Sequence, residues 1–322
     1  MSPTLPLVGG DALPALGFGC WKVPAKAAPD VIKQAIHQGY RHIDSACDYG
    51  NEDAVGAGLR AADCAREEIW VTSKLWNTYH DPAHVRAACE RSLHDLGLDY
   101  LDLYHVHFPI SLAYVDPELR YPPGWFHEPK AANPSMVFAD IPMHETWSAM
   151  EELVDAGLVR NIGVCNLNTA FLRDLAAGAR IQPAVHQIEL HPYLAQEKML
   201  ELCVSLGIAV TGFSPFGASS YVPIAMASAE DRVLDDPVVA EIANSCGRSA
   251  AQVLLRWGIQ RGTAVVPKAT QIPHMRENFA IFDFELSAEQ VASISALDRH
   301  QRFNDPGDFC PRFFNTDCPI YE

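Results

Sequence analysis

Four polar side chains end or follow successive apolar runs in the first third of the sequence. The runs "RHID", "EIWVTSK" and "YLDLYHVH" end in Asp44, Lys74 and His107, and Tyr49 follows the first run in a short turn. Each has an ordinary structural explanation, since a strand-end aspartate often caps a helix, a lysine is usually solvated, and a histidine can be a satisfied core residue. Their shared position at strand ends favours a common site.

These residue types suit the reduction of a carbonyl group. Tyrosine ionises near pH 10 in water, so a tyrosine that acts as a general acid needs its anion stabilised. A lysine within a few ångströms does this, and a carboxylate behind the lysine holds it in place. A histidine can orient the carbonyl oxygen with a hydrogen bond. None of the four delivers a hydride, so a nicotinamide cofactor must supply it.

The elements that would position these residues alternate between strand and helix. Eight strand-plus-helix units follow one another along the chain, which is typical of an α/β fold of the (β/α)₈ TIM-barrel type. A doubly wound sheet is the alternative, but "LGFGCW" does not extend to GxGxxG. We expect an N-terminal hairpin with "GGD" as its turn to close the barrel floor, and several helices to end at Gly39, Gly97, Gly157 and Gly207.

Two segments are longer than ordinary loops. Residues 108–143 are rich in proline and aromatic side chains, and a long tail follows Asp298. The aromatic "YPPGWF" argues against disorder and predicts a pocket wall at the carboxyl face of the barrel. No linker or low-complexity tract divides the sequence, so residues 1–322 are expected to form one domain.

Composition excludes several classes of protein. The net charge of −16 argues against a surface for nucleic acid or for an anionic membrane. No apolar run is long enough for a transmembrane helix, and the N-terminus has no basic region ahead of an apolar stretch, so no signal peptide is expected. Nine cysteines without CxxC spacing fit reduced thiols in the cytoplasm. A monomer and a homodimer both remain open.

The sequence resembles the aldo-keto reductases along nearly its whole length. "HIDSACDYGNE", "VTSKLW", "HVHFP", "IGVCN", "AVHQIELHPY" and "VVPKA" occur in that family's order and spacing. "YPPGWF", "HETWSAMEELVDAGLVRNIGV" and "RFNDP" place it nearest the xylose (aldose) reductase branch. The resemblance implies that Tyr49 is the general acid, that Asp44 and Lys74 support it, and that His107 directs the carbonyl.

The resemblance also implies an NADP(H) site. Asn166 and Gln187 match the residues that bind the nicotinamide carboxamide, but Cys165 replaces a serine and is a weaker hydrogen-bond partner. Phe213 takes the position of the aromatic ring that stacks on the nicotinamide. An ordinary core role for Phe213 remains the alternative. The loop that covers the pyrophosphate starts at Ser214 and continues through Pro215 and Phe216.

The segment "VVPKATQIPHMREN" departs from the family pattern for the adenosine 2′-phosphate. Lys268 and Asn278 are kept, whereas Ala269 and Thr270 replace Ser-Asn. His274 falls where an arginine is expected, and Arg276 lies two residues later. A largely neutral histidine lacks the charged fork of arginine. We therefore expect NADPH to bind less exclusively than usual, with NADH as a second cofactor.

The expected substrate site combines aromatic walls with a few polar groups. Its candidate residues are Trp21, Asp48, Phe108, Trp125, Phe126 and Asn304. In the xylose reductase branch, Asp48 and Asn304 resemble hydroxyl-binding positions, which favours sugar-like aldehydes. The aromatic tail "GDFCPRFFNTDCPIYE" fits bulky ketones or aromatic aldehydes equally well.

Two other classes of protein compete with a reductase. A metal-dependent barrel hydrolase could use His105 and His107, which share one strand face, but it needs more ligands and Lys74 would repel a cation. A non-catalytic nucleotide sensor could keep the same fold. The four intact catalytic positions favour the enzyme.

Overall fold

Eight parallel strands curl into a barrel in this computed structural model, which describes residues 3–321. Each strand pairs with the next along the chain. The first strand meets the last through a parallel bridge between Leu16 and Val265, and the amide of Val265 donates to Ala15 at 2.9 Å. The strands are β3 (Phe18–Gly19), β4 (His42–Asp44), β5 (Trp70–Leu75), β6 (Leu101–Val106), β7 (Val159–Cys165), β8 (Val185–Glu189), β9 (Ala209–Phe213) and β10 (Ala264–Val265). The predicted TIM barrel is confirmed.

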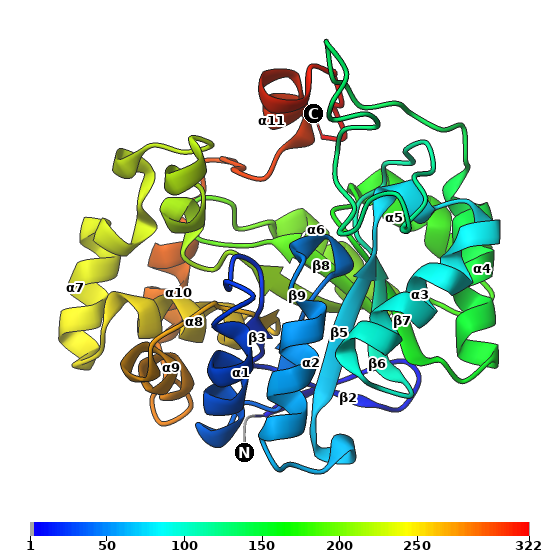
Figure 1. Cartoon of the computed structure of the whole chain (residues 1–322). Helices are drawn as coiled ribbons and strands as arrows, with labels where there is room; N and C mark the ends of the chain where they lie inside the picture. Colours follow the sequence, from blue (N-terminus) through cyan, green and yellow to red (C-terminus); the bar gives the residue numbers. More distant parts are fainter. Residues whose placement is uncertain (1–2, 322) are drawn as a thin grey trace.

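The helices cover the outside of the barrel (Figure 1). In α1 the residues Val31, Ile32, Ala35 and Ile36 are buried, as their helical spacing predicts. The helices are α1 (Ala28–His37), α2 (Glu52–Ala61), α3 (Pro82–Leu96), α4 (Met143–Asp155), α5 (Thr169–Gly178), α6 (Glu197–Leu206), α7 (Pro237–Cys246), α8 (Ala250–Gln260), α9 (Ile272–Phe279), α10 (Ala288–Ser295) and α11 (Pro306–Phe314). None of these helices, within residues 3–321, is long and apolar enough to cross a membrane.

The chain begins with the expected hairpin. Strands β1 (Thr4–Pro6) and β2 (Ala12–Pro14) pair antiparallel. Leu13 is buried in a cluster with Trp70, Leu103 and Val185 from the barrel strands, so the hairpin packs against the barrel interior. In Figure 1 it lies at the lower end, opposite α11.

Helix ends follow the glycines that the sequence marks. Helices α3 and α6 stop at Gly97 and Gly207, which have φ values of 68° and 70° and so adopt the left-handed conformation that favours glycine. Strand β10 is short: of residues 263–269, only Ala264–Val265 form it. The reason is Pro267, which has no amide hydrogen to continue the ladder.

The two long segments meet at the carboxyl ends of the strands, at the top of Figure 1. Trp125 of the first segment stacks on Phe314 of α11, with ring centroids 5.5 Å apart. Leu112 and Phe138 pair within the first segment, so it is ordered. The prediction that "YPPGWF" forms a pocket wall is confirmed, because Trp125 lines the cavity described below.

A buried glutamate joins three elements behind the barrel wall. Glu52, in the first turn of α2, is 3% exposed and accepts hydrogen bonds from Ser73 of β5 at 2.6 Å and Ser92 of α3 at 2.9 Å. Burial raises the pKa of Glu52 to about 7, although both hydroxyl groups oppose the shift. The carboxylate form therefore costs stability in the folded protein.

This burial predicts a specific dependence of stability on pH. In the unfolded chain Glu52 ionises near pH 4.3, so the folded state loses stability from there up to about pH 7 and the loss then levels off. The loss is on the order of 3 kcal/mol at about 1.4 kcal/mol per pKa unit. Glu52→Gln cannot ionise and should lose correspondingly less stability between pH 4 and 8 in urea unfolding.

Glu241→Gln provides the control, because Glu241 is exposed on α7. The free energy of unfolding of Glu241→Gln should change with pH in the same way as that of the wild-type protein. Parallel curves for wild type and Glu52→Gln would contradict the assignment of this pH dependence to Glu52.

Candidate active site

A buried ion pair lies at the base of the site. Lys74 of β5 is fully buried, and its amine donates to Asp44 Oδ1 at 2.7 Å and to the carbonyl oxygen of Ser45 at 2.8 Å. Burial lowers the pKa of Lys74, but the charges of Asp44 and Tyr49 raise it more, so the pKa stands above its ordinary value. The amine is therefore a permanent cation at neutral pH.

The hydroxyl of Tyr49 lies 3.3 Å from the amine of Lys74. Tyr49 ends a short 3₁₀ helix, Cys47–Tyr49, just after β4. This contact is the one that the sequence predicts. Burial nevertheless raises the pKa of Tyr49, Lys74 lowers it by less, and the carboxylates of Asp44 and Asp48 add to the rise. The expectation that the lysine makes this phenol more acidic than in water is wrong for the protein alone, because burial outweighs the cation.

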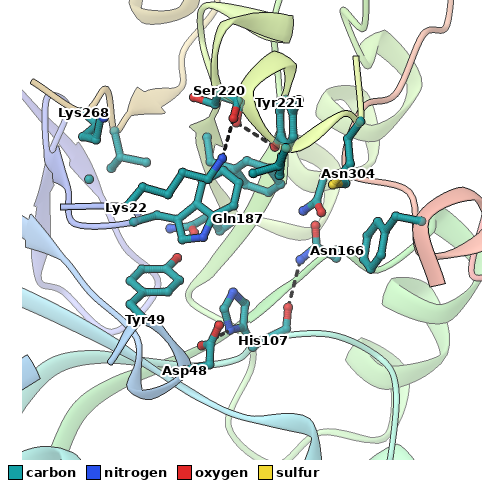
Figure 2. A pocket seen from close by; sticks show the side chains of 18 of the residues that line it. Lys22, Asp48, Tyr49, His107, Asn166, Gln187, Ser220, Tyr221, Lys268 and Asn304 are labelled. Atoms are coloured by element: carbon teal, nitrogen blue, oxygen red, sulfur yellow. Dashed lines mark hydrogen bonds and ion pairs between the residues drawn. The ribbon is translucent and has the colours of Figure 1, made fainter. Parts of the chain in front are cut away.

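His107 faces the same pocket as Tyr49. Its Nδ1 lies 3.0 Å from Asp48 Oδ1, and its ring centroid is 5.9 Å from that of Tyr49. If Nδ1 carries the proton that bonds Asp48, Nε2 remains for a ligand. The side-chain amide of Asn166 donates to the carbonyl oxygen of His107 at 2.9 Å. Figure 2 shows Asp48, Tyr49 and His107 together on one side of the pocket.

His105 does not share this site. It is fully buried, neither ring nitrogen has a hydrogen-bond partner, and it is absent from the pocket lining. Burial and the charge of Lys74 hold its pKa well below the ordinary value. Among residues 3–321 no three His, Cys, Asp or Glu side chains are grouped so that they could hold a metal ion.

A cavity of about 560 Å³ opens above Tyr49. Much of its wall is aromatic, and polar side chains lie between the rings. Residues that the sequence predicts and that line it are Trp21, Asp44, Asp48, Tyr49, His107, Phe108, Trp125, Asn166, Gln187, Phe213, Ser214, Pro215, Phe216, Lys268 and Asn304. Most of the proposed catalytic and substrate residues thus converge on one cavity.

Two lysines approach each other on another part of this wall. Lys22 donates to the carbonyl oxygen of Ser220 at 2.5 Å, a contact drawn in Figure 2. Burial and then the charge of Lys268 lower the pKa of Lys22 to about 8. Two like charges held together in an acidic protein favour an anionic ligand between them.

The cavity fits a nicotinamide dinucleotide. The amides of Asn166 and Gln187 lie beside Tyr49 and His107, the aromatic rings of Phe213 and Phe216 line the wall, and the lysines provide positive charge for phosphate groups. The side-chain amide of Gln187 also donates to Asp44 Oδ2 at 2.7 Å. The ion pair is therefore connected directly to the wall that would hold the nicotinamide.

Some predicted residues do not reach the cavity. Cys165 is buried at the end of β7, and the chain turns toward the pocket only at the next residue, Asn166. Phe126 packs against Phe314 with centroids 5.2 Å apart, so it supports the wall from behind. Lys74 lies beneath Tyr49. Ala269, Thr270, His274, Arg276 and Asn278 also lie outside the lining.

The residues of the predicted 2′-phosphate cluster differ in their exposure to solvent. Ala269 and Asn278 are buried, whereas His274 and Arg276 are exposed. The Nε of Arg276 donates to Gln38 Oε1 at 2.8 Å. This contact directs Arg276 toward the residue that follows α1.

Several residues that line the cavity were not predicted from the sequence. Lys22 and Trp76 each follow a strand end by a few residues, a position that could have suggested them. Tyr221, from the segment after β9, and Phe309, Phe313 and Phe314, from α11, also line the cavity, but they lie far from Tyr49 in the sequence.

Comparisons with known proteins agree with this geometry. A model of the aldo/keto reductase family matches residues 15–299. The NAD(P)H-dependent D-xylose reductase of Pyricularia oryzae is 44% identical to this chain over 98% of this chain and 98% of its own length. The NAD(P)H-dependent D-xylose reductase of Aspergillus niger is also 44% identical, over 97% of this chain and 99% of its own length. The 4-dihydromethyl-trisporate dehydrogenase of Mucor mucedo is 45% identical over 92% of this chain and 93% of its own length.

A solved structure supports the same assignment. The aldose reductase of Schistosoma japonicum matches with a TM-score of 0.83 and 37% identity, over 94% of both chains. The residues that the family model matches include Asp44, Lys74 and His107. This chain therefore belongs to the aldo/keto reductase family.

Proposed function

We propose that this chain reduces small aldehydes, above all open-chain aldoses such as D-xylose, with NADPH or NADH. Its family membership makes it an oxidoreductase that converts a carbonyl group to an alcohol with a nicotinamide cofactor. The observation that supports the reaction most directly is the hydroxyl of Tyr49, 3.3 Å from the buried amine of Lys74 at the cavity wall.

We propose the following roles for the chain's own residues. In its doubly protonated form, His107 donates one hydrogen bond from Nε2 to the carbonyl oxygen and another from Nδ1 to Asp48 Oδ1, which fixes the ring. Tyr49 donates its proton to the carbonyl oxygen of the substrate as that oxygen gains negative charge, and Lys74 stabilises the phenolate that remains. A phenol with a raised pKa can still serve, because the alkoxide that forms is a stronger base than phenolate. The bound cofactor supplies the hydride.

The cofactor site follows from the same cavity. We propose that Asn166 and Gln187 hold the carboxamide, that Phe213 packs on the nicotinamide ring, and that residues 214–216 cover the pyrophosphate with Lys22 and Lys268 beside it. His274 and Arg276 are exposed, and Arg276 contacts Gln38, so neither forms a rigid fork for the 2′-phosphate. This supports NADPH with NADH as a second cofactor.

The proposed substrate class rests on two polar side chains of the cavity wall, Asp48 and Asn304. Both residues line the same cavity as Tyr49 and can bind hydroxyl groups of an aldose. The D-xylose reductase relatives support this choice. A bulkier ketone or alcohol is the second candidate, favoured by the rings of Phe309, Phe313 and Phe314.

We further propose that the enzyme works in the cytoplasm. All nine cysteines are free thiols in the structure. This state is stable in a reducing compartment.

Replacing the general acid should abolish turnover without preventing cofactor binding. For Tyr49→Phe we expect kcat to fall by about 10²–10⁴-fold, since proton donation is lost. The affinity for NADPH, measured by quenching of protein fluorescence, should stay nearly unchanged. Tyr100→Phe is the control, because the Tyr100 ring packs on Arg66 and Arg160 outside the cavity. Metal-dependent turnover that survives in Tyr49→Phe would support the hydrolase instead.

A second substitution separates the substrate classes. Asn304→Ala should raise the KM for D-xylose by roughly five- to tenfold, which corresponds to the free energy of one hydrogen bond. The KM for benzaldehyde should stay almost unchanged. Steady-state kinetics with both substrates on one preparation makes this an internal comparison. Equal effects on both aldehydes would argue against a hydroxyl-binding role.

Cofactor choice can be tested at the histidine of α9. His274→Arg adds a charged, bidentate donor, so the ratio of kcat/KM for NADPH to that for NADH should rise by roughly tenfold. Ser245→Arg, on the distant helix α7, controls for added charge. A wild-type preference for NADPH above about a thousandfold would overturn the idea of relaxed specificity.

A further inference from the structure

The segment that carries the aromatic wall is fastened to the barrel near its start. Glu189, the last residue of β8, is fully buried. Its carboxylate accepts hydrogen bonds from the backbone amides of Phe303 at 3.0 Å and Asn304 at 2.9 Å. These bonds fix the point where residues 303–321 leave the barrel.

The far end of this segment returns to the neighbouring strand. The hydroxyl of Tyr321 donates to the backbone carbonyl oxygen of Asn166 at 3.0 Å and lies 3.5 Å from its side-chain oxygen. The guanidinium of Arg302 covers the Tyr321 ring at 3.6 Å from the centroid, and Asn168 donates to the carbonyl oxygen of Ile320 at 3.3 Å. Burial raises the pKa of Tyr321, so the hydroxyl keeps its proton and acts as a donor at neutral pH.

Asn166 is the residue that this contact holds. It has a φ of 62°, a left-handed conformation that costs energy for any residue other than glycine. Its amide donates to the carbonyl oxygen of Gln187 at 3.1 Å, and its side chain donates to that of His107 at 2.9 Å. The Tyr321 bond is a further contact, and it comes from the C-terminal segment.

We infer that Tyr321 is a positioning residue that fixes Asn166 for binding the nicotinamide carboxamide. The inference rests on the proposed function, which gives Asn166 its role toward the cofactor. Because the same segment carries Phe309, Phe313 and Phe314, one chain segment joins the substrate wall to the nicotinamide wall. Tyr321 itself does not line the cavity, so it acts through Asn166.

The test is Tyr321→Phe in the full-length protein. This change removes one hydroxyl and keeps the ring over Arg302. We expect the Kd for NADPH, measured by fluorescence quenching without substrate, to rise by about three- to tenfold, the size of one hydrogen bond. The KM for NADPH should rise with it, while the KM for the aldehyde changes less than twofold.

Tyr193→Phe is the matched control. The Tyr193 hydroxyl donates to Asp236 at 2.9 Å, and its carbonyl oxygen accepts from the backbone amides of Arg299 and Gln301. It thus loses a similar hydrogen bond near the start of the same segment without touching Asn166. Its Kd for NADPH should equal that of wild type, and both variants should show similar melting temperatures.

Two results would overturn the inference separately from the proposed function. An unchanged Kd for NADPH in Tyr321→Phe would remove the positioning role, with wild-type turnover left intact. A raised KM for the aldehyde at unchanged Kd for NADPH would make Tyr321 a support of the substrate wall only. A wild-type protein that fails to bind NADPH would overturn the proposed function itself.

Discussion

The site depends on a full charge buried between two barrel strands. Taking an ammonium group out of water costs several kcal/mol, and removing its partner from such a pair typically costs about 3–5 kcal/mol. Lys74 is tolerated here because Asp44, on the adjacent strand β4, and the carbonyl oxygen of Ser45 take its hydrogen bonds. The strand register that aligns β4 with β5 therefore also places the amine beneath the Tyr49 hydroxyl. The same alignment of β4 with β5 is therefore needed both for the stability of the buried ion pair and for the contact between Lys74 and Tyr49.

Strand-end residues could be predicted because the physics that places them is local. Asp44, Lys74 and His107 end apolar runs, and parallel strands bring such ends to one face. The acidity of Tyr49 could not be read in the same way. Its pKa depends on how completely the folded chain excludes water, and that burial outweighs the lysine. Phe126 shows a related limit: it neighbours Trp125 in the sequence, but only Trp125 reaches the cavity.

Long-range packing sets the rest of the pocket. Phe309, Phe313 and Phe314 line the same cavity as Tyr49, which lies some 260 residues earlier, and nothing in their spacing identifies that partner. Asn304 lines the pocket, and the buried carboxylate of Glu189 on β8 holds this part of the chain through the backbone amides of Phe303 and Asn304. Much of the cavity wall thus comes from segments outside the barrel strands, and the names of two relatives, a D-xylose reductase and a 4-dihydromethyl-trisporate dehydrogenase, refer to different substrates.

The paired lysines have a consequence for proton exchange with the medium. Lys22 has a pKa of about 8 because burial and Lys268 disfavour its charge. A phosphate group between the two amines would restore that charge. Above about pH 8, capture of a dinucleotide should therefore withdraw a fraction of a proton from the buffer. Release of the dinucleotide should return this proton to the buffer. The affinity for the dinucleotide should therefore fall as the pH rises above about 8, while the chemical step depends on other groups.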